Sequence, residues 1–170
     1  NEIADQDIKA FLRLKPGETF SFAGRHFQIT DMPGDPHPLQ RPLPLMLGGA
    51  RPRMLALAGR CADIVNLLTL QDVGATSQVL EEKLRHVRAG AGARFAALEL
   101  ATPIALVAGA HADPLEAVRR ALPQAPFARH LAARMPLETL AASAFVLAGD
   151  SARILAELQE RRERWGLSYY

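Results

Sequence analysis

The first part of the chain shows two different spacings of apolar residues. Helical spacing over residues 3–12 predicts a helix that ends before Pro16 and Gly17. Apolar and polar residues then alternate in residues 19–22 and 25–30, on either side of Ala23-Gly24, which predicts a β-hairpin. We expect this hairpin to pack through its aromatic residues, which are Phe20, Phe22 and Phe27.

Short, unbroken apolar runs replace this alternation after residue 44. Five prolines in residues 33–44 predict an extended connection, and the runs beyond it suit strands that are covered on both faces. We expect core strands at residues 45–48, 62–68, 98–107 and 167–170, with a bulge or break at Pro103. Residues 145–147 predict one more short extended piece. Strands that alternate with helices predict an α/β fold with a parallel sheet.

Helical spacing fills the gaps between these strands. The predicted helices are residues 51–60, 77–89, a helix that starts at 113–116, one from about 136, and 151–164. Glycines are expected to end two of them, Gly90 with Gly92 and Gly166. The residues expected to face inward are Met54, Leu57, Ala58, Cys61, Leu80, Leu84, Val87, Ile154, Leu155, Leu158 and Trp165. The expected ion pairs are Glu81–Arg85, Glu157–Arg161 and Glu160–Arg164.

Composition narrows the class of protein. The 170 residues are 49% hydrophobic and 22% charged with a net charge of +2, which is globular composition and too weakly basic to favour nucleic-acid binding. No apolar run is long enough to predict a membrane span or membrane partner. The single cysteine, Cys61, excludes an internal disulfide and favours a reducing, cytoplasmic setting. Because the first residue is Asn1, we expect a processed product or a fragment.

The clearest candidate site is the turn after the first core strand. Gly48, Gly49, Ala50 and Arg51 lie between a strand end and a helix start, where unpaired N–H groups and the helix dipole favour a phosphate. The alternative is a tight turn whose glycines only satisfy geometry. Asn66 lies near the carboxyl end of the next predicted strand, residues 62–68, and is equally a ligand-facing residue or a polar residue at a strand end. The histidines show no metal-ligand spacing, and no catalytic residue is assigned.

Three stretches resemble the luciferase-like monooxygenase superfamily. They are residues 20–27 (FSFAGRHF), 42–49 (PLPLMLGG) and 54–65 (MLALAGRCADIV), and residues 145–150 with 164–170 resemble its coenzyme F420-dependent branch. The resemblance implies a partial (β/α)8 TIM barrel: approximately strands 5–8, with a β-hairpin insertion before strand 5. Residues 1–170 would form a single incomplete domain, the C-terminal half of the barrel, with residues 17–44 as the insertion.

The resemblance also implies a function. The complete protein would be an oxidoreductase that uses reduced F420 or FMN to transfer hydride or activate oxygen on a small organic substrate. Gly48, Gly49, Ala50, Arg51 and Asn66 would bind the cofactor, although Ala50 replaces the family's usual third glycine. The complete protein would form a homo-oligomer, and the chain alone is expected to be inactive. A non-catalytic half-barrel that binds an anionic ligand or associates with a partner is the alternative.

Overall fold

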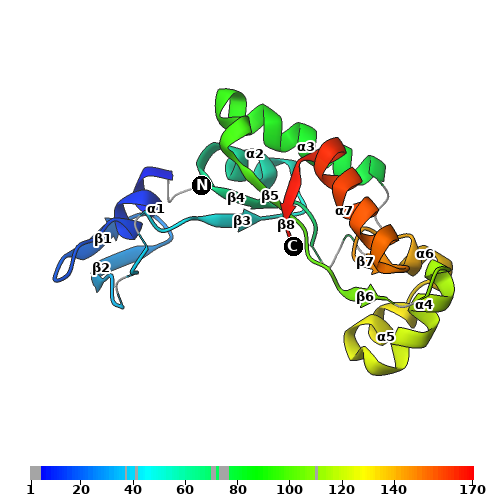
Figure 1. Cartoon of the computed structure of the whole chain (residues 1–170). Coiled ribbons are helices and arrows are strands. Elements are labelled where there is room, and N and C mark those ends of the chain that lie inside the picture. Colours follow the sequence, from blue (N-terminus) through cyan, green and yellow to red (C-terminus); the bar gives the residue numbers. More distant parts are fainter. Residues whose placement is uncertain (1–4, 37, 41, 70–71, 73–76, 110) are drawn as a thin grey trace. The chain divides into compact units, whose positions relative to one another are not determined.

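The computed structural model describes residues 5–36, 38–40, 42–69, 72, 77–109 and 111–170. These residues fall into two compact units, Asn1–Leu45 and Met46–Tyr170, which are described separately below. Every element named here is labelled in Figure 1 or lies between two labelled elements. The assignment of residues 1–170 to one incomplete domain stays a prediction.

The first unit contains the expected helix and hairpin. Helix α1 (Asp5–Leu12) precedes strands β1 (Thr19–Ala23) and β2 (Gln28–Pro33), which pair antiparallel. The ring of Phe20 lies 5.8 Å from that of Phe11, edge to face, so the hairpin packs against the helix through this aromatic pair. The expectation that Phe27 packs in the hairpin is wrong. Phe27 lies in the connecting turn, just before β2 begins at Gln28, and 60% of its surface is exposed.

The second unit is built on a parallel sheet of four short strands. They are β3 (Met46–Gly48), β4 (Ile64–Asn66), β5 (Glu99–Ala101) and β8 (Leu167–Tyr169), hydrogen-bonded in that order. The predicted α/β class and the parallel direction of these strands are therefore confirmed. Leu47, Val65, Leu100 and Leu167 are register partners across this sheet and pack into one core.

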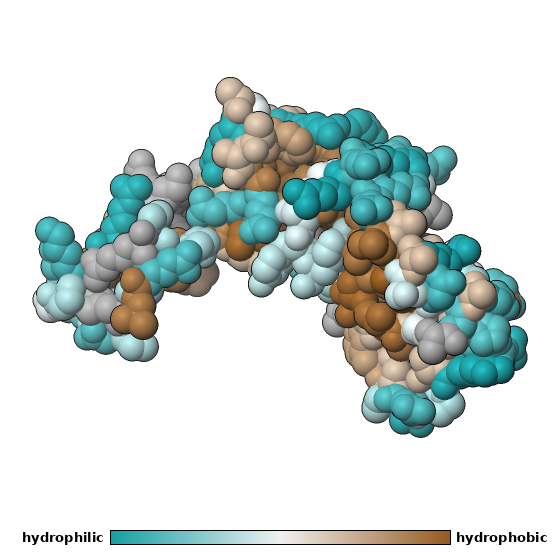
Figure 2. All heavy atoms as spheres, in the orientation of Figure 1, coloured by the Kyte–Doolittle hydropathy of each residue, from teal (hydrophilic) through white to brown (hydrophobic). Residues whose placement is uncertain are grey.

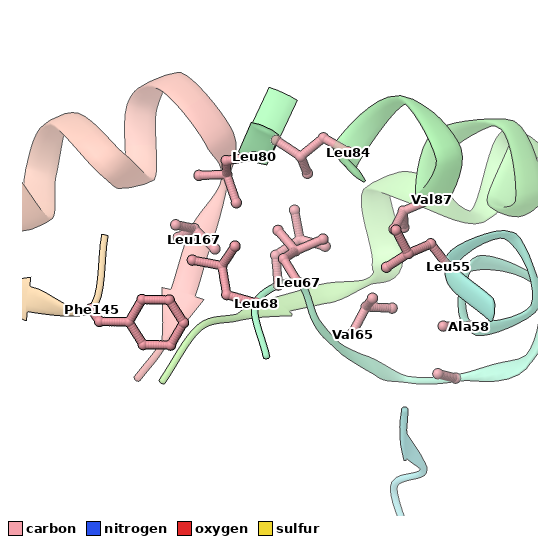
Figure 3. Packing of buried hydrophobic residues seen from close by; sticks show 12 residues of the cluster. Leu55, Ala58, Val65, Leu67, Leu68, Leu80, Leu84, Val87, Phe145 and Leu167 are labelled. Atoms are coloured by element: carbon pink, nitrogen blue, oxygen red, sulfur yellow. The ribbon is translucent and has the colours of Figure 1, made fainter. Parts of the chain in front are cut away.

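Helices α2 (Pro52–Cys61) and α3 (Ser77–Ala91) cover one face of this sheet (Figure 1). Figure 3 shows Leu55 and Ala58 of α2 and Leu84 and Val87 of α3 directed into the core with Val65 of β4. Leu55 was not among the expected inward residues, yet it is fully buried, whereas Met54 and Leu57 are half-buried. Helix α3 also continues through Gly90, and a 3-10 helix, η2 (Gly92–Ala97), follows it.

The predicted third strand, residues 98–107, is divided at Pro103 into strands of two different sheets. Its second part, β6 (Leu106–Ala108), pairs parallel with β7 (Val146–Ala148) in a separate two-stranded sheet. Four helical segments pack near this sheet: α4 (Pro114–Ala121), η3 (Leu122–Gln124), α5 (Pro126–Ala132) and α6 (Leu137–Ala141). The expected start of α4 is confirmed, because the Asp113 carboxylate accepts a hydrogen bond from the Leu115 N–H.

Helix α7 (Ser151–Trp165) ends at Gly166, whose φ of 76° is left-handed as a helix C-cap requires. The prediction that Leu155 faces inward is wrong, because 56% of its surface is exposed. The buried α7 residue is Arg161, whose guanidinium donates to the Ala144 and Val146 carbonyl oxygens and pairs with Glu157 as predicted.

Two of the expected helix-surface ion pairs are wrong. Glu81 Oε1 accepts a hydrogen bond of 2.7 Å from Arg164 Nη2, which joins α3 to α7. Within the described residues, this contact replaces the expected Glu81–Arg85 and Glu160–Arg164 pairs. The sequence spacing was compatible with the local pairs, but the packing of the two helices brings a distant partner closer.

Two further observations concern long apolar helices and exposed apolar side chains. Within the described ranges, no helix has the length and apolar character needed to cross a membrane. In the second unit, apolar side chains gather at the surface beside β6 (Figure 2), where Val107 is 59% exposed.

Candidate functional site

The turn between β3 and α2 has the geometry of an anion-binding helix start. Gly48 ends β3, and Arg51 is the N-cap residue of α2 with φ −103° and ψ 146°. The Arg51 carbonyl oxygen accepts the N–H groups of Met54 and Leu55, each at 3.0 Å. No side chain caps this helix, and Pro52 occupies the first turn, where its missing N–H costs nothing.

Three backbone donors of this turn are left without an acceptor. The N–H groups of Ala50, Arg51 and Arg53 donate no hydrogen bond to any residue that the structure describes. Exposed N–H groups at a helix start carry the positive end of the helix dipole. They therefore point to an acceptor that the described residues do not supply.

Charge around the turn favours the same ligand. The first turn of α2 contains no acidic residue, and the side chains of Arg51 and Arg53 are exposed. Two exposed guanidinium groups beside three free N–H groups would attract a phosphate and repel a cation.

Gly48 is required by the close approach of the neighbouring strand. Gly48 and Asn66 are register partners, and a Cβ on Gly48 would lie 3.1 Å from Asn66 Cβ and 3.2 Å from its carbonyl oxygen. Because Leu47 and Val65 pack toward the helices, strand alternation places Gly48 and Asn66 on the opposite face. A larger residue at position 48 would therefore press against the Asn66 side chain.

Asn66 itself carries an unsatisfied polar atom. Its Oδ1 is buried and has no hydrogen-bond partner among the residues that the structure describes. A buried acceptor without a donor costs about 1–3 kcal/mol, and such orphans are few in native structures. At the carboxyl end of a parallel strand, where α/β proteins bind their ligands, this orphan points to a ligand donor.

Gly49 has a packing role of its own. A Cβ there would lie 2.6 Å from Met54 Cγ, so the glycine lets the first turn of α2 fold back over the loop. Neither Gly48 nor Gly49 has a left-handed φ. The tight-turn interpretation therefore has a physical basis at Gly49, and the ligand interpretation rests on the free N–H groups and on Asn66.

The structure brings the five candidate residues together at the carboxyl ends of β3 and β4. Gly48, Gly49, Ala50 and Arg51 form the turn, and Asn66 is hydrogen-bonded in register beside Gly48. Their role in binding a cofactor stays a prediction.

Sequence reasoning missed two groups near these strand ends. Thr102 follows β5 directly and is 2% exposed, and no described residue forms a hydrogen bond with its hydroxyl. Asp72, in the loop after β4, forms an ion pair of 2.6 Å with Lys83 of α3, and both side chains are almost buried. Thr102 lies inside the predicted strand 98–107, one residue before the break expected at Pro103, and that break was the available signal that a strand ends there. The pairing of Asp72 with Lys83 had no such signal.

Comparison with solved structures gives the same fold at low identity. The chain resembles coenzyme F420-dependent tetrahydromethanopterin reductase from Methanopyrus kandleri, with 14% identity and a TM-score of 0.62 over 98% of the chain. It also resembles an F420-dependent secondary alcohol dehydrogenase (18% identity, TM-score 0.55, 97% of the chain). A third similar structure is the monooxygenase RslO1 from Streptomyces bottropensis (18% identity, TM-score 0.62, 95% of the chain).

The chain spans about half the length of these structures, covering 53%, 52% and 49% of them. The curated proteins contain no match to it. The model of one protein family, described as luciferase-like monooxygenase, matches residues 7–167. That match covers nearly all of both units, and the chain therefore belongs to the luciferase-like monooxygenase family.

Proposed function

We propose that this chain supplies the phosphate-binding part of an oxidoreductase that uses reduced F420 or FMN. The turn from Gly48 to Arg51 would hold the cofactor phosphate through the free N–H groups of Ala50, Arg51 and Arg53. The observation that carries the proposal is this set of unused donors, at a helix start without any acidic residue.

The residues present fit such a cofactor. The free N–H groups match phosphate oxygens, and the orphaned Asn66 Oδ1 offers an acceptor on the adjacent strand. When bound and reduced, F420 supplies a hydride, and FMN supplies a hydride or activates oxygen. The part of this chain is to fix the phosphate end, so that the ring is held in one place.

Family membership supports redox chemistry. Two of the similar structures are named as F420-dependent enzymes and the third as a monooxygenase. A homo-oligomeric complete protein and a cytoplasmic location stay predictions, and the substrate is a small organic molecule whose identity the site does not specify.

Removing one donor of the turn should weaken binding of a phosphate-bearing flavin. Arg51 is already extended, so Arg51→Pro keeps ψ, needs only a modest change in φ, and deletes one N–H. We expect FMN binding to weaken by about 10- to 150-fold, since a hydrogen bond to a charged group contributes about 1.5–3 kcal/mol. Riboflavin, which lacks the phosphate, should bind equally to both proteins. Fluorescence titration measures all four affinities.

Arg51→Ala is the matched control, because it removes the guanidinium and keeps the N–H. Its loss should be only a few-fold and should shrink as salt rises. Position 49 is unsuited to this test, because a larger residue there would strike Met54. Equal FMN affinity in the parent and in Arg51→Pro would contradict the proposal.

The non-catalytic alternative uses the same anion site and differs in having no turnover. Apolar side chains exposed in the second unit, such as Met46, Val107 and Tyr169, favour association with a partner. This alternative stays a prediction.

A further inference from the structure

The loop that leaves β4 is tied to helix α3 at a single carboxylate oxygen. Asp72 Oδ2 accepts hydrogen bonds from Lys83 Nζ at 2.6 Å, from the Thr69 N–H at 2.7 Å and from the Thr69 hydroxyl at 2.9 Å. The Asp72 N–H donates in turn to the Thr69 carbonyl oxygen at 2.8 Å. Thr69 and Asp72 therefore close one turn, and Lys83 connects that turn to α3.

Stability alone does not explain a charged pair in this place. The side chains of Lys83 and Asp72 are only 7% and 10% exposed, so both charges lose most of their hydration on folding. Replacing such a pair by apolar residues of similar size is often neutral or stabilising. Leu80 and Leu84, on the same side of α3 as Lys83, are buried in the core. An apolar side chain at position 83 would lack direction, however, because only hydrogen bonds fix the carboxylate at one position.

The turn lies three residues beyond the candidate site. Asn66 ends β4, and Leu67 and Leu68 then pack into the core, fully buried (Figure 3). The Leu67 N–H donates to a carbonyl oxygen of β5 at 2.9 Å. Thr69 follows these core residues, and its contacts with Asp72 fix where the loop goes next. Because α/β proteins bind their ligands at the carboxyl ends of parallel strands, the position of this loop bears on ligand binding.

Resting on the proposed function, we infer that Lys83 is a positioning residue for the ligand site. Through Asp72 and Thr69 it holds the loop after β4 in the one conformation in which the ligand site is formed. The Lys83 side chain is buried and donates to Asp72, so it acts through the loop and not by touching the ligand. Without Lys83 the loop would occupy several conformations, and the apparent affinity would fall with the fraction that is competent to bind.

A double substitution separates positioning from stability. Lys83→Met alone strands the Asp72 carboxylate and should lower both stability and affinity. Adding Asp72→Asn removes the stranded charge and keeps an oxygen for Thr69, so the double variant should unfold at nearly the urea concentration of the parent. Its FMN affinity, measured by fluorescence titration, should stay about 3- to 30-fold below that of the parent, because the turn is no longer connected to α3.

Backbone NMR of the double variant supplies a second readout. The amide signal of Thr69 should broaden or split, because the loop exchanges between conformations. The signals of Val65 and Leu100, in the strands of the core, should keep their parent positions. The matched control is Glu116→Gln with Arg120→Met, which removes an exposed ion pair of α4 and should change neither stability nor FMN affinity.

The possible outcomes are distinct. A double variant that regains both the stability and the FMN affinity of the parent would show that Lys83 is only structural, and the proposed function would stand. If the double variant stays less stable than the parent, the Thr69 signal decides: a broadened signal supports the inference, and a single sharp signal overturns it. A parent protein that binds no FMN would overturn the proposed function and this inference together.

Discussion

Replacing Gly90 with alanine is expected to destabilise the protein by about 3 kcal/mol. Gly90 lies where α3 crosses α2, and a Cβ there would overlap the Ala56 carbonyl oxygen and lie 2.7 Å from Ala56 Cα. These are backbone atoms, so no side-chain rotation relieves the clash. Elsewhere in a helix the same change adds about 1 kcal/mol of stability, so the expected sign is reversed.

Each of the two helices contributes one glycine to this close crossing, so the prediction can be tested from both sides. Gly59 of α2 faces α3, and a Cβ there would overlap the Val87 carbonyl oxygen and lie 2.9 Å from Ala91 N. Gly59→Ala should therefore have a similar effect. Because the turn of the candidate site leads into α2, separating the two helices would also displace the free N–H groups.

Urea denaturation measures both variants, with Gly109→Ala as the matched control. A Cβ at Gly109 meets no atom within 4 Å, so alanine there should leave stability within about 0.5 kcal/mol of the parent. A Gly90→Ala protein that unfolds at the same urea concentration as the parent would contradict the close crossing.

The second large effect is expected at the buried ion pair of Asp72 and Lys83. Lys83→Met should destabilise the protein by about 3–5 kcal/mol, because it leaves a buried carboxylate without its cation. Thr69 also donates to this carboxylate, from its N–H at 2.7 Å and its hydroxyl at 2.9 Å. Thus Lys83 joins α3 to the loop that follows Asn66 and β4.

The pair also predicts a pH dependence. Burial alone would raise the pKa of Asp72, but the hydrogen bonds from Lys83 and Thr69 outweigh it and hold that pKa below the usual 3.8. The unfolded chain therefore binds this proton more readily than the folded chain does. The stability that Asp72 contributes is complete well above pH 3.8 and is lost as pH falls through its lower folded pKa.

Denaturation at several pH values checks this account. The difference in unfolding free energy between the parent and Lys83→Met should be largest near pH 7 and should narrow below about pH 4, as Asp72 becomes protonated. Arg120→Met is the control, since its pair with Glu116 is exposed and screened by solvent, so its loss should hardly change stability. An equally small effect of Lys83→Met and Arg120→Met would show that the Asp72 pair is dispensable.

Local patterns predicted the elements that depend on neighbouring residues. The hairpin, the parallel strands between helices, the Asp113 cap and the Gly166 end all follow from spacing or from one residue's conformational preference. The turn of the candidate site was found in the same way, because a glycine pair between a strand and a helix is a local signal.

Features that depend on contacts between distant residues could not be predicted from local sequence patterns. Pro103 indicated a break, but nothing local shows that β6 then pairs with β7, about forty residues later, in a second sheet. Helical spacing alone placed Leu155 inward, but it is exposed. The buried residue of α7 is Arg161, which donates hydrogen bonds to the carbonyl oxygens of Ala144, before β7, and Val146, in β7. The unsatisfied Asn66 oxygen likewise depends on what the neighbouring strands fail to donate.

Backbone NMR during a phosphate titration tests the phosphate site most directly. With amide resonances assigned, we expect inorganic phosphate to shift the N–H signals of Ala50, Arg51 and Arg53 more than any others, with a shared dissociation constant. FMN should shift the same signals at lower concentration. Phosphate shifts that are largest elsewhere in the chain, or absent from these three amides, would contradict the site.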